Sequence, residues 1–180
     1  LVLLCFLLTI ELVKVTSQMN IFFWIQIFFI LLLVLFLPAF EKFRQLFFLG
    51  IIISVLTDAG AYYIGKTIGK TKIFPSTSPN KTLEGVIGGS FFCVAFLSVL
   101  FWSFPLLFTL NTNLTVFIFL IFISSLASIV GDYLQSKFKR TQGVKDSGNI
   151  LPGHGGLSDR LDSHLVTLPV FFGLIISFGL

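Results

Sequence analysis

The polar residues between Asp132 and Asp162 are the clearest candidates for chemistry in this chain. This stretch of 31 residues supplies four carboxylates, five basic side chains and one histidine. Carboxylate oxygens suit hard cations such as Mg²⁺, and Lys and Arg side chains bind phosphate oxygens. The combination is typical of a site for a metal–polyphosphate complex. Its candidate residues are Asp132, Ser136, Lys139, Arg140, Lys145, Asp146, His154, Asp159, Arg160 and Asp162.

Three details favour a binding site here over a merely solvated loop, which composition alone would also allow. Asp132 ends an apolar run, where a charge is costly and tends to mark function. Three glycines surround His154 and would let the backbone approach a ligand closely. Asp159 and Asp162 would share one face of a helix. For His154 alone, a structural hydrogen-bonding role is as well supported as an acid–base role.

A second polar cluster contains Asp58, Ser78, Lys81 and Thr82, with several glycines between and after them. Exposed N–H groups of a glycine-rich backbone can cradle phosphate. The cluster is not a Walker A loop, because its glycine spacing is too short and no Gly-Lys-Ser/Thr follows at the required distance. The alternatives are structural: Gly88-Gly89 would serve close helix packing, and Thr82 with Glu84 would cap a helix.

The elements that position these residues must lie in lipid. Of the 180 residues, 56% are hydrophobic and 11% are charged, and 24 are Phe. Soluble domains carry about 25% charged residues. Cys5 and Cys93 both lie in apolar runs, so neither a disulfide framework nor a metal pair is indicated.

We expect an all-α, polytopic membrane domain with about six transmembrane helices, because unpaired strands are not tolerated in lipid. The first residue is Leu within an apolar run, which leads us to expect a piece of a longer chain. The predicted spans are Leu1–Val13, Ile21–Leu37, Leu46–Ile64, Val86–Phe108, Leu114–Gly131 and Leu165–Leu180.

Two long polar loops, Gly65–Leu83 and Asp132–His164, are separated by two predicted spans and should therefore lie on the same side of the membrane. Ten of the twelve basic residues fall on that side, and only Lys42 and Arg44 oppose it. The positive-inside rule predicts that both loops are cytoplasmic.

The run SKFKRTQGVKDSGNILPGHGGLSDRLD, Ser136–Asp162, resembles the signature of the phosphatidate cytidylyltransferase (CDP-diacylglycerol synthase) family at every defining position. Asp58 and the run SPNKTLEG, which begins at Ser78, are similar to a second block of that family, with Asn80 in place of a basic residue. The resemblance extends from about Leu46 to the C-terminus. Family members have further N-terminal spans, and we expect that this chain lacks them.

The resemblance implies the transfer of a cytidylyl group from CTP to phosphatidate, with Mg²⁺ and room for a second cation. It implies a bilayer as partner, allows a homodimer, and suggests a bacterial inner membrane; nothing points to nucleic acid. Asp132 and Asp159 would be the metal ligands. The implied catalytic residues are Asp132, Lys139, Arg140, Lys145, Asp146 and Asp159. The implied substrate-binding residues are Asp58, Ser78, Lys81, Thr82, Ser136, His154, Arg160 and Asp162.

A CTP-dependent lipid or polyprenol kinase is the main alternative, and it would transfer the γ-phosphoryl group instead. A transporter is disfavoured because the charges concentrate in two loops rather than in paired broken helices. A CDP-alcohol phosphotransferase would need a glycine directly after the Asp159–Asp162 pair, and Ser163 stands there.

Overall fold

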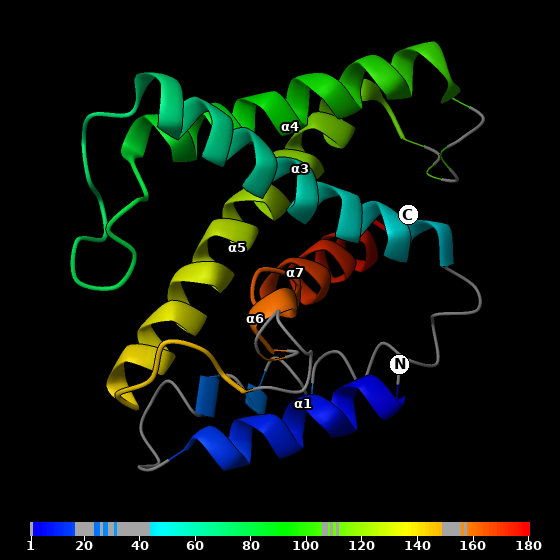
Figure 1. Cartoon of the computed structure of the whole chain (residues 1–180). Coiled ribbons are helices and arrows are strands. Elements are labelled where there is room, and N and C mark those ends of the chain that lie inside the picture. Colours follow the sequence, from blue (N-terminus) through cyan, green and yellow to red (C-terminus); the bar gives the residue numbers. More distant parts are fainter. Residues whose placement is uncertain are drawn as a thin grey trace.

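The computed structural model of this chain is a bundle of apolar helices (Figure 1). It describes residues 2–16, 24–25, 27–28, 31, 44–105, 108, 110, 112–148, 156 and 158–180. Their helices are α1 (Val2–Val15), α3 (Arg44–Ile68), α4 (Leu83–Ser103), α5 (Leu114–Thr141), α6 (Ser158–Leu161) and α7 (His164–Ser177). These residues contain no strand beyond an isolated bridge between Lys72 and Thr82. The all-α prediction is confirmed for this part of the chain.

Four helical stretches within the described residues are long and apolar enough to cross a membrane: α3, α4, α5, and α6 continued by α7. The protein is therefore an integral membrane protein. The predicted total of six spans is not confirmed. Helix α1 has 14 residues, fewer than the roughly 20 that a bilayer requires. Most of the predicted span Ile21–Leu37 lies outside the described residues.

Helix α5 corrects the predicted boundary between span and loop. It does not end at Gly131 but continues to Thr141, so the first ten residues of the predicted polar loop are helical. Its 28 residues extend about 42 Å, more than the roughly 30 Å of a hydrocarbon core. Gln, Lys and Arg are good helix formers, so the helix continues beyond its apolar residues. Asp132 and the basic residues after it are thereby placed on a rigid element.

Helix α4 ends at Ser103, five residues before the predicted end of that span. Its last carbonyls lie just ahead of Phe104-Pro105, and a residue before proline is disfavoured in the helical conformation.

Helices α3 and α4 approach closely along a stripe of small residues. A Cβ added at Gly89 would lie 2.6 Å from the backbone nitrogen of Ala61, and one added at Gly60 would lie 3.1 Å from the Cα of Gly89. Small residues at such interfaces let helix backbones pack tightly in membranes. The packing role expected for Gly88-Gly89 is confirmed, and it brings Asp58 on α3 near the start of α4.

The buried apolar side chains of α3, α4, α5 and α7 form the core of the bundle, with Ile53, Cys93, Phe117, Ile121 and Phe171 fully buried. Cys93 is a free thiol there, as predicted. Figure 1 shows α1 beside α6, away from α3 and α4, and α1 and α6 contact each other. Helices α3, α5 and α7 contact one another, so polar residues carried by all three can meet at one place.

Candidate active site

The two polar segments meet at one cavity of about 620 Å³. It brings together five of the predicted site residues, which come from α3, the α3–α4 connection, α5 and the turn between α6 and α7. These five are Asp58, Lys81, Thr82, Asp132 and Asp162. Both segments thus lie at the same end of the bundle, as the count of spans between them requires.

The α3–α4 connection folds back on itself to deliver Lys81 to this cavity. Lys72 pairs with Thr82 in an antiparallel bridge, and the N–H of Leu83 donates to the carbonyl of Thr71 at 2.8 Å. The Lys81 ammonium group forms an ion pair with the carboxylate of Asp132. This contact joins the two polar segments directly.

The carboxylate of Glu84 fixes the beginning of the same connection to α4. It accepts the backbone N–H of Lys70 at 3.0 Å, and the N–H and hydroxyl of Thr71 at 3.1 Å and 2.9 Å. The ring of Phe74 packs on that of Tyr133 of α5, with 4.4 Å between centroids. These contacts hold the connection against both helices.

Thr82 has two roles that the sequence offered as alternatives. It is the N-cap of α4, where its hydroxyl accepts the N–H of Gly85 at 3.2 Å. It also lines the cavity. Capping therefore places this residue at the site.

One face of α5 carries a row of predicted site residues. Asp132, Ser136 and Lys139 are four and then three residues apart, which puts them on successive turns of the same face. The hydroxyl of Ser136 donates to Asp132 Oδ1 at 3.2 Å, and the hydroxyl of Ser78 donates to Ser136 Oγ at 3.3 Å. Ser78 and Ser136 thereby support the cavity residue Asp132.

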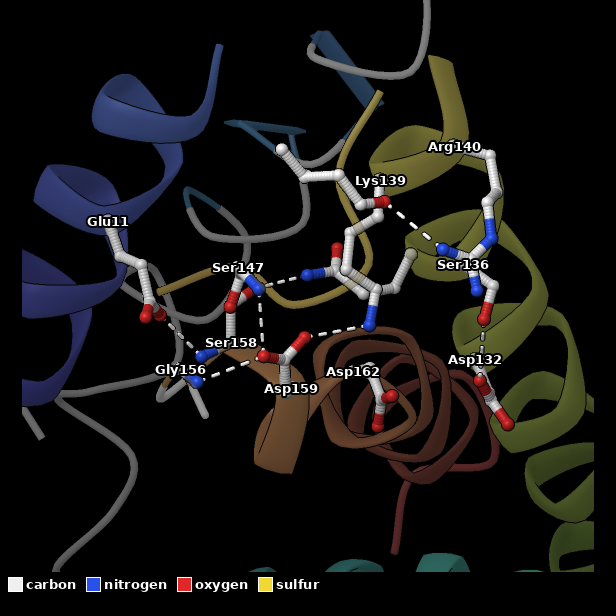
Figure 2. A network of polar contacts seen from close by, with 12 residues as sticks. Glu11, Asp132, Ser136, Lys139, Arg140, Ser147, Gly156, Ser158, Asp159 and Asp162 are labelled. Atoms are coloured by element: carbon white, nitrogen blue, oxygen red, sulfur yellow. Dashed lines mark hydrogen bonds and ion pairs between the residues drawn. The ribbon is translucent and has the colours of Figure 1, made fainter. Parts of the chain in front are cut away.

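Asp159 lies in a different network, shown in Figure 2. Its Oδ1 accepts a hydrogen bond from the Lys139 ammonium group at 2.7 Å. Its Oδ2 accepts the backbone N–H of Ser147 at 2.8 Å and of Gly156 at 2.9 Å. Asp159 is not among the residues that line the cavity. It ties the end of α5 to the segments that follow it.

Ser163 links the two remaining carboxylates of the cavity. Its hydroxyl donates to Asp58 Oδ2 at 3.0 Å, and its N–H donates to Asp162 Oδ1 at 2.8 Å. The buried hydroxyl of Ser54 donates in turn to Ser163 Oγ at 2.7 Å. Sequence reasoning missed Ser163 and Ser54, although Ser54 precedes Asp58 by one helical turn.

Gly131 allows α5 to approach this pair of carboxylates. A Cβ added there would lie 2.9 Å from the carbonyl oxygen of Asp162 and 3.0 Å from that of Ser163. Both neighbours are backbone atoms and cannot rotate away. The absence of a side chain at Gly131 therefore sets the distance between Asp132, the next residue, and Asp162.

The other predicted site residues that the structure describes lie outside the cavity. Arg140 is exposed and its guanidinium donates to the carbonyl of Val144 at 3.2 Å. Lys145, Asp146 and Arg160 are also exposed, and His154 lies outside the described residues. The cavity is instead completed by residues not predicted as site residues, including Tyr62, Lys66, Lys72 and Asn80.

The cavity offers the donor chemistry for a magnesium ion. Asp58, Asp132 and Asp162 supply carboxylate oxygens at one cavity, and Mg²⁺ is usually bound by one or two carboxylates together with substrate phosphates. In the part of the chain that is described, no three His, Cys, Asp or Glu side chains form a complete ligand cluster. The site therefore fits an ion that shares its ligands with a phosphorylated substrate.

Comparison with known proteins defines the class to which this site belongs. Residues 1–178 match the model of the cytidylyltransferase family. The chain therefore belongs to the cytidylyltransferase family.

Its relatives include phosphatidate cytidylyltransferases from several bacteria. The protein of Staphylococcus aureus (strain COL) is 48% identical over 123 residues, which are 67% of this chain and 45% of that protein. The protein of Bacillus subtilis (strain 168) is 42% identical over 127 residues, 68% of this chain and 44% of that protein. This chain thus spans about half the length of the curated relatives that it matches.

Proposed function

We propose that this chain transfers the cytidylyl group of CTP to phosphatidate, giving CDP-diacylglycerol and pyrophosphate. The observation that carries the proposal is the cavity in which Lys81 and three carboxylates meet at one end of an apolar helix bundle. Membership of the cytidylyltransferase family supports it, as do the names of the relatives.

The chemistry asks the protein for positioning rather than for a strong base. The second pKa of a phosphate monoester is about 6, so the phosphate of phosphatidate is already largely dianionic at neutral pH. One of its oxygens would form a bond to the α-phosphorus of CTP. At the same time the bond breaks between that phosphorus and the oxygen that links it to the β-phosphorus. Pyrophosphate leaves with that oxygen. The main barrier is the approach of two polyanions.

The basic side chains of the cavity would lower this barrier. Lys66, Lys72 and Lys81 line it and can hold phosphate oxygens in the orientation for in-line attack. Lys139 lies two turns after Asp132 on the same face of α5, where its ammonium group contacts Asp159. Ser78 and Ser136 would fix the position of Asp132 through their hydrogen bonds.

We propose Mg²⁺ as the cofactor, with Asp132 as its ligand in the cavity and Asp159 as the second ligand. Bound there, the ion would neutralise the triphosphate and the leaving pyrophosphate. In this structure Asp159 faces Lys139 and two backbone N–H groups, so its role as a ligand stays a prediction. A second cation and a homodimer also stay predictions.

The membrane would deliver one substrate and the water phase the other. Phosphatidate is held in the bilayer with its phosphate at the interface, and we propose that the cavity, which lies at one end of the bundle, faces that interface. We propose that this end faces the cytoplasm of a bacterial inner membrane, because most basic residues lie on it. We further propose one membrane-embedded domain over residues 1–180 with about six spans.

Replacing Lys81 with alanine should raise the KM for CTP about tenfold or more, since a charge-assisted contact to phosphate is lost. The change also leaves Asp132 without its cationic neighbour. Lys70→Ala is the matched control: Lys70 is exposed on the same connection and outside the cavity lining. Steady-state kinetics with CTP varied would measure both. An unchanged KM in the Lys81 variant would make this lysine a membrane-flanking charge.

Gly131→Ala should lower kcat about tenfold, because the added methyl group pushes the Asp162–Ser163 backbone away from Asp132 and small displacements of reacting groups are costly. Gly173→Ala on α7 is the control, since its Cβ would meet nothing within 4 Å. Equal activity in the two folded variants would contradict the importance of this approach.

Radiolabelled CTP tests the proposed reaction against the kinase alternative. With label on the α-phosphorus, the proposal predicts labelled lipid; with label on the γ-phosphorus, it predicts labelled pyrophosphate and unlabelled lipid. The reverse pattern would identify transfer of the γ-phosphoryl group and overturn the proposal.

A further inference from the structure

Glu11 is a buried carboxylate in an otherwise apolar helix, and the proposed mechanism leaves it unused. Helix α1 carries only one other charged residue, Lys14, which is exposed. Glu11 itself is 1% exposed. A carboxylate is costly to bury unless polar partners compensate for its lost hydration. A side chain that only filled space here would be apolar, so the partners of Glu11 indicate what it does.

The partners of Glu11 belong to the segments around Asp159. Glu11 Oε2 accepts the backbone N–H of Ser158 at 2.6 Å, a contact that spans 147 positions of sequence. The hydroxyl of Ser158 accepts a hydrogen bond from the amide of Gln135 on α5. Ser158 is therefore held from α1 on one side and from α5 on the other.

Two glycines make room for the Glu11 carboxylate. A Cβ added at Gly148 would lie 2.6 Å from Glu11 Oε1, and one added at Gly156 would also collide with that carboxylate. Gly148 follows the end of α5, whereas Gly156 precedes α6. The carboxylate thus sits against both segments at once.

Asp159 holds the same segments from the opposite side. It accepts hydrogen bonds from the backbone N–H groups of Ser147 and Gly156 (Figure 2). Gly156 itself lies against the Glu11 carboxylate, and Ser147 directly precedes Gly148, which does so too. Two carboxylates from helices far apart in sequence therefore secure one backbone arrangement, and Lys139 is attached to it through Asp159.

We propose that Glu11 is a positioning residue for the active site: by accepting the Ser158 N–H, it fixes the backbone that orients Asp159 and Lys139. This inference rests on the proposed function for its kinetic part and on the contacts above for its structural part. The role needs an acceptor oxygen at this place, and a glutamine would still supply one.

The test compares Glu11→Ala and Glu11→Gln in the full chain in lipid nanodiscs, with Lys14→Ala as the control on the same helix. We expect Glu11→Ala to lower kcat about tenfold with little change in the KM for CTP. Amide hydrogen exchange at Ser158 should be at least about tenfold faster, as loss of one hydrogen bond predicts. Glu11→Gln should restore both values to near those of the unmodified chain.

A second variant approaches the contact from the other side. Gly156→Ala should speed exchange at Ser158 in the same way, because its methyl group displaces the Glu11 carboxylate, and Gly173→Ala should not. Unchanged exchange at Ser158 in both Glu11→Ala and Gly156→Ala would overturn the proposal, as would a fall in kcat without faster exchange. If the unmodified chain forms no CDP-lipid, the proposed function fails, and the exchange measurements still decide whether Glu11 holds this backbone.

Discussion

Replacing Asp132 with asparagine should lower the rate of CDP-lipid formation by about 100-fold or more. Asp132 forms an ion pair with Lys81 and accepts a hydrogen bond from the Ser136 hydroxyl. It lines the cavity together with Asp58 and Asp162. Asparagine has nearly the same shape but lacks the charge that a cation and a lysine require. The loss of one principal electrostatic contact in such a site costs about 10² to 10³ in rate.

The measurement is the rate at saturating CTP as a function of Mg²⁺ concentration. A metal ligand at this position predicts that Asp132→Asn raises the Mg²⁺ requirement as well as lowering the maximal rate. Lys137→Gln is the control, because it changes a charge on the same helix five residues away and on a different face. A folded Asp132→Asn protein with a near-normal rate would refute the proposed role.

Replacing Asp159 with asparagine should also lower the rate by about 100-fold, but with a change in structure that Asp132→Asn lacks. Asp159 and Lys139 are about nine-tenths buried, and removing one partner of such a pair leaves the other uncompensated. The neutral amide oxygen of asparagine is also a weaker acceptor than a carboxylate oxygen, and the amide NH₂ group would face the Lys139 ammonium group if that oxygen kept both N–H groups. The hydrogen bonds to Ser147 and Gly156 should therefore weaken, and exchange of both amide hydrogens should become faster.

A double-mutant cycle isolates the ion pair from the other contacts of Asp159. If Lys139 acts on the rate through Asp159, the effects of Asp159→Asn and Lys139→Gln should be strongly non-additive. Additive losses would mean that the two side chains act separately. A raised Mg²⁺ requirement in Asp159→Asn, equal to that of Asp132→Asn, would support its predicted role as the second metal ligand.

The membrane-spanning core could be predicted because long apolar runs have few alternatives in lipid. Leu46–Ile64 and Leu114–Gly131 both lie within observed helices. The helix ends were less predictable, since hydropathy falls where a helix leaves the bilayer even if the helix continues. The extension of α5 to Thr141 depends on Phe138, which is fully buried among the neighbouring elements, and on good helix formers around it.

The candidate site was predicted in part. The count of spans correctly indicated that Asp58, Lys81, Asp132 and Asp162 lie at one end of the bundle. It could not indicate that Lys81 pairs with Asp132, which depends on the folded-back α3–α4 connection. The position of Asp159 outside the cavity was equally unpredictable. Helix α6 ends at Leu161, so Asp162 lies beyond it and does not share a helix face with Asp159, as the spacing of the two residues had suggested.

The residues missed by sequence reasoning are those whose role depends on distant partners. A single Glu in an apolar run indicates a special role, so Glu11 could have been noticed in the sequence. Its partner could not have been predicted, because Ser158 is 147 residues away. Ser54 lies one helical turn before Asp58 on α3, but Ser163 meets both residues only because the residue that begins α7 packs against α3.

The most direct test of the proposed function is a product balance with the full chain in nanodiscs that contain phosphatidate. CTP and Mg²⁺ are added, and CDP-lipid and pyrophosphate are quantified together. The proposed reaction predicts that both products form in equal amounts, only when phosphatidate is present, and that Asp132→Asn lowers the rates of both together by about 100-fold or more. Phosphorylated lipid with CDP in solution, or no CDP-lipid from the folded chain, would contradict it.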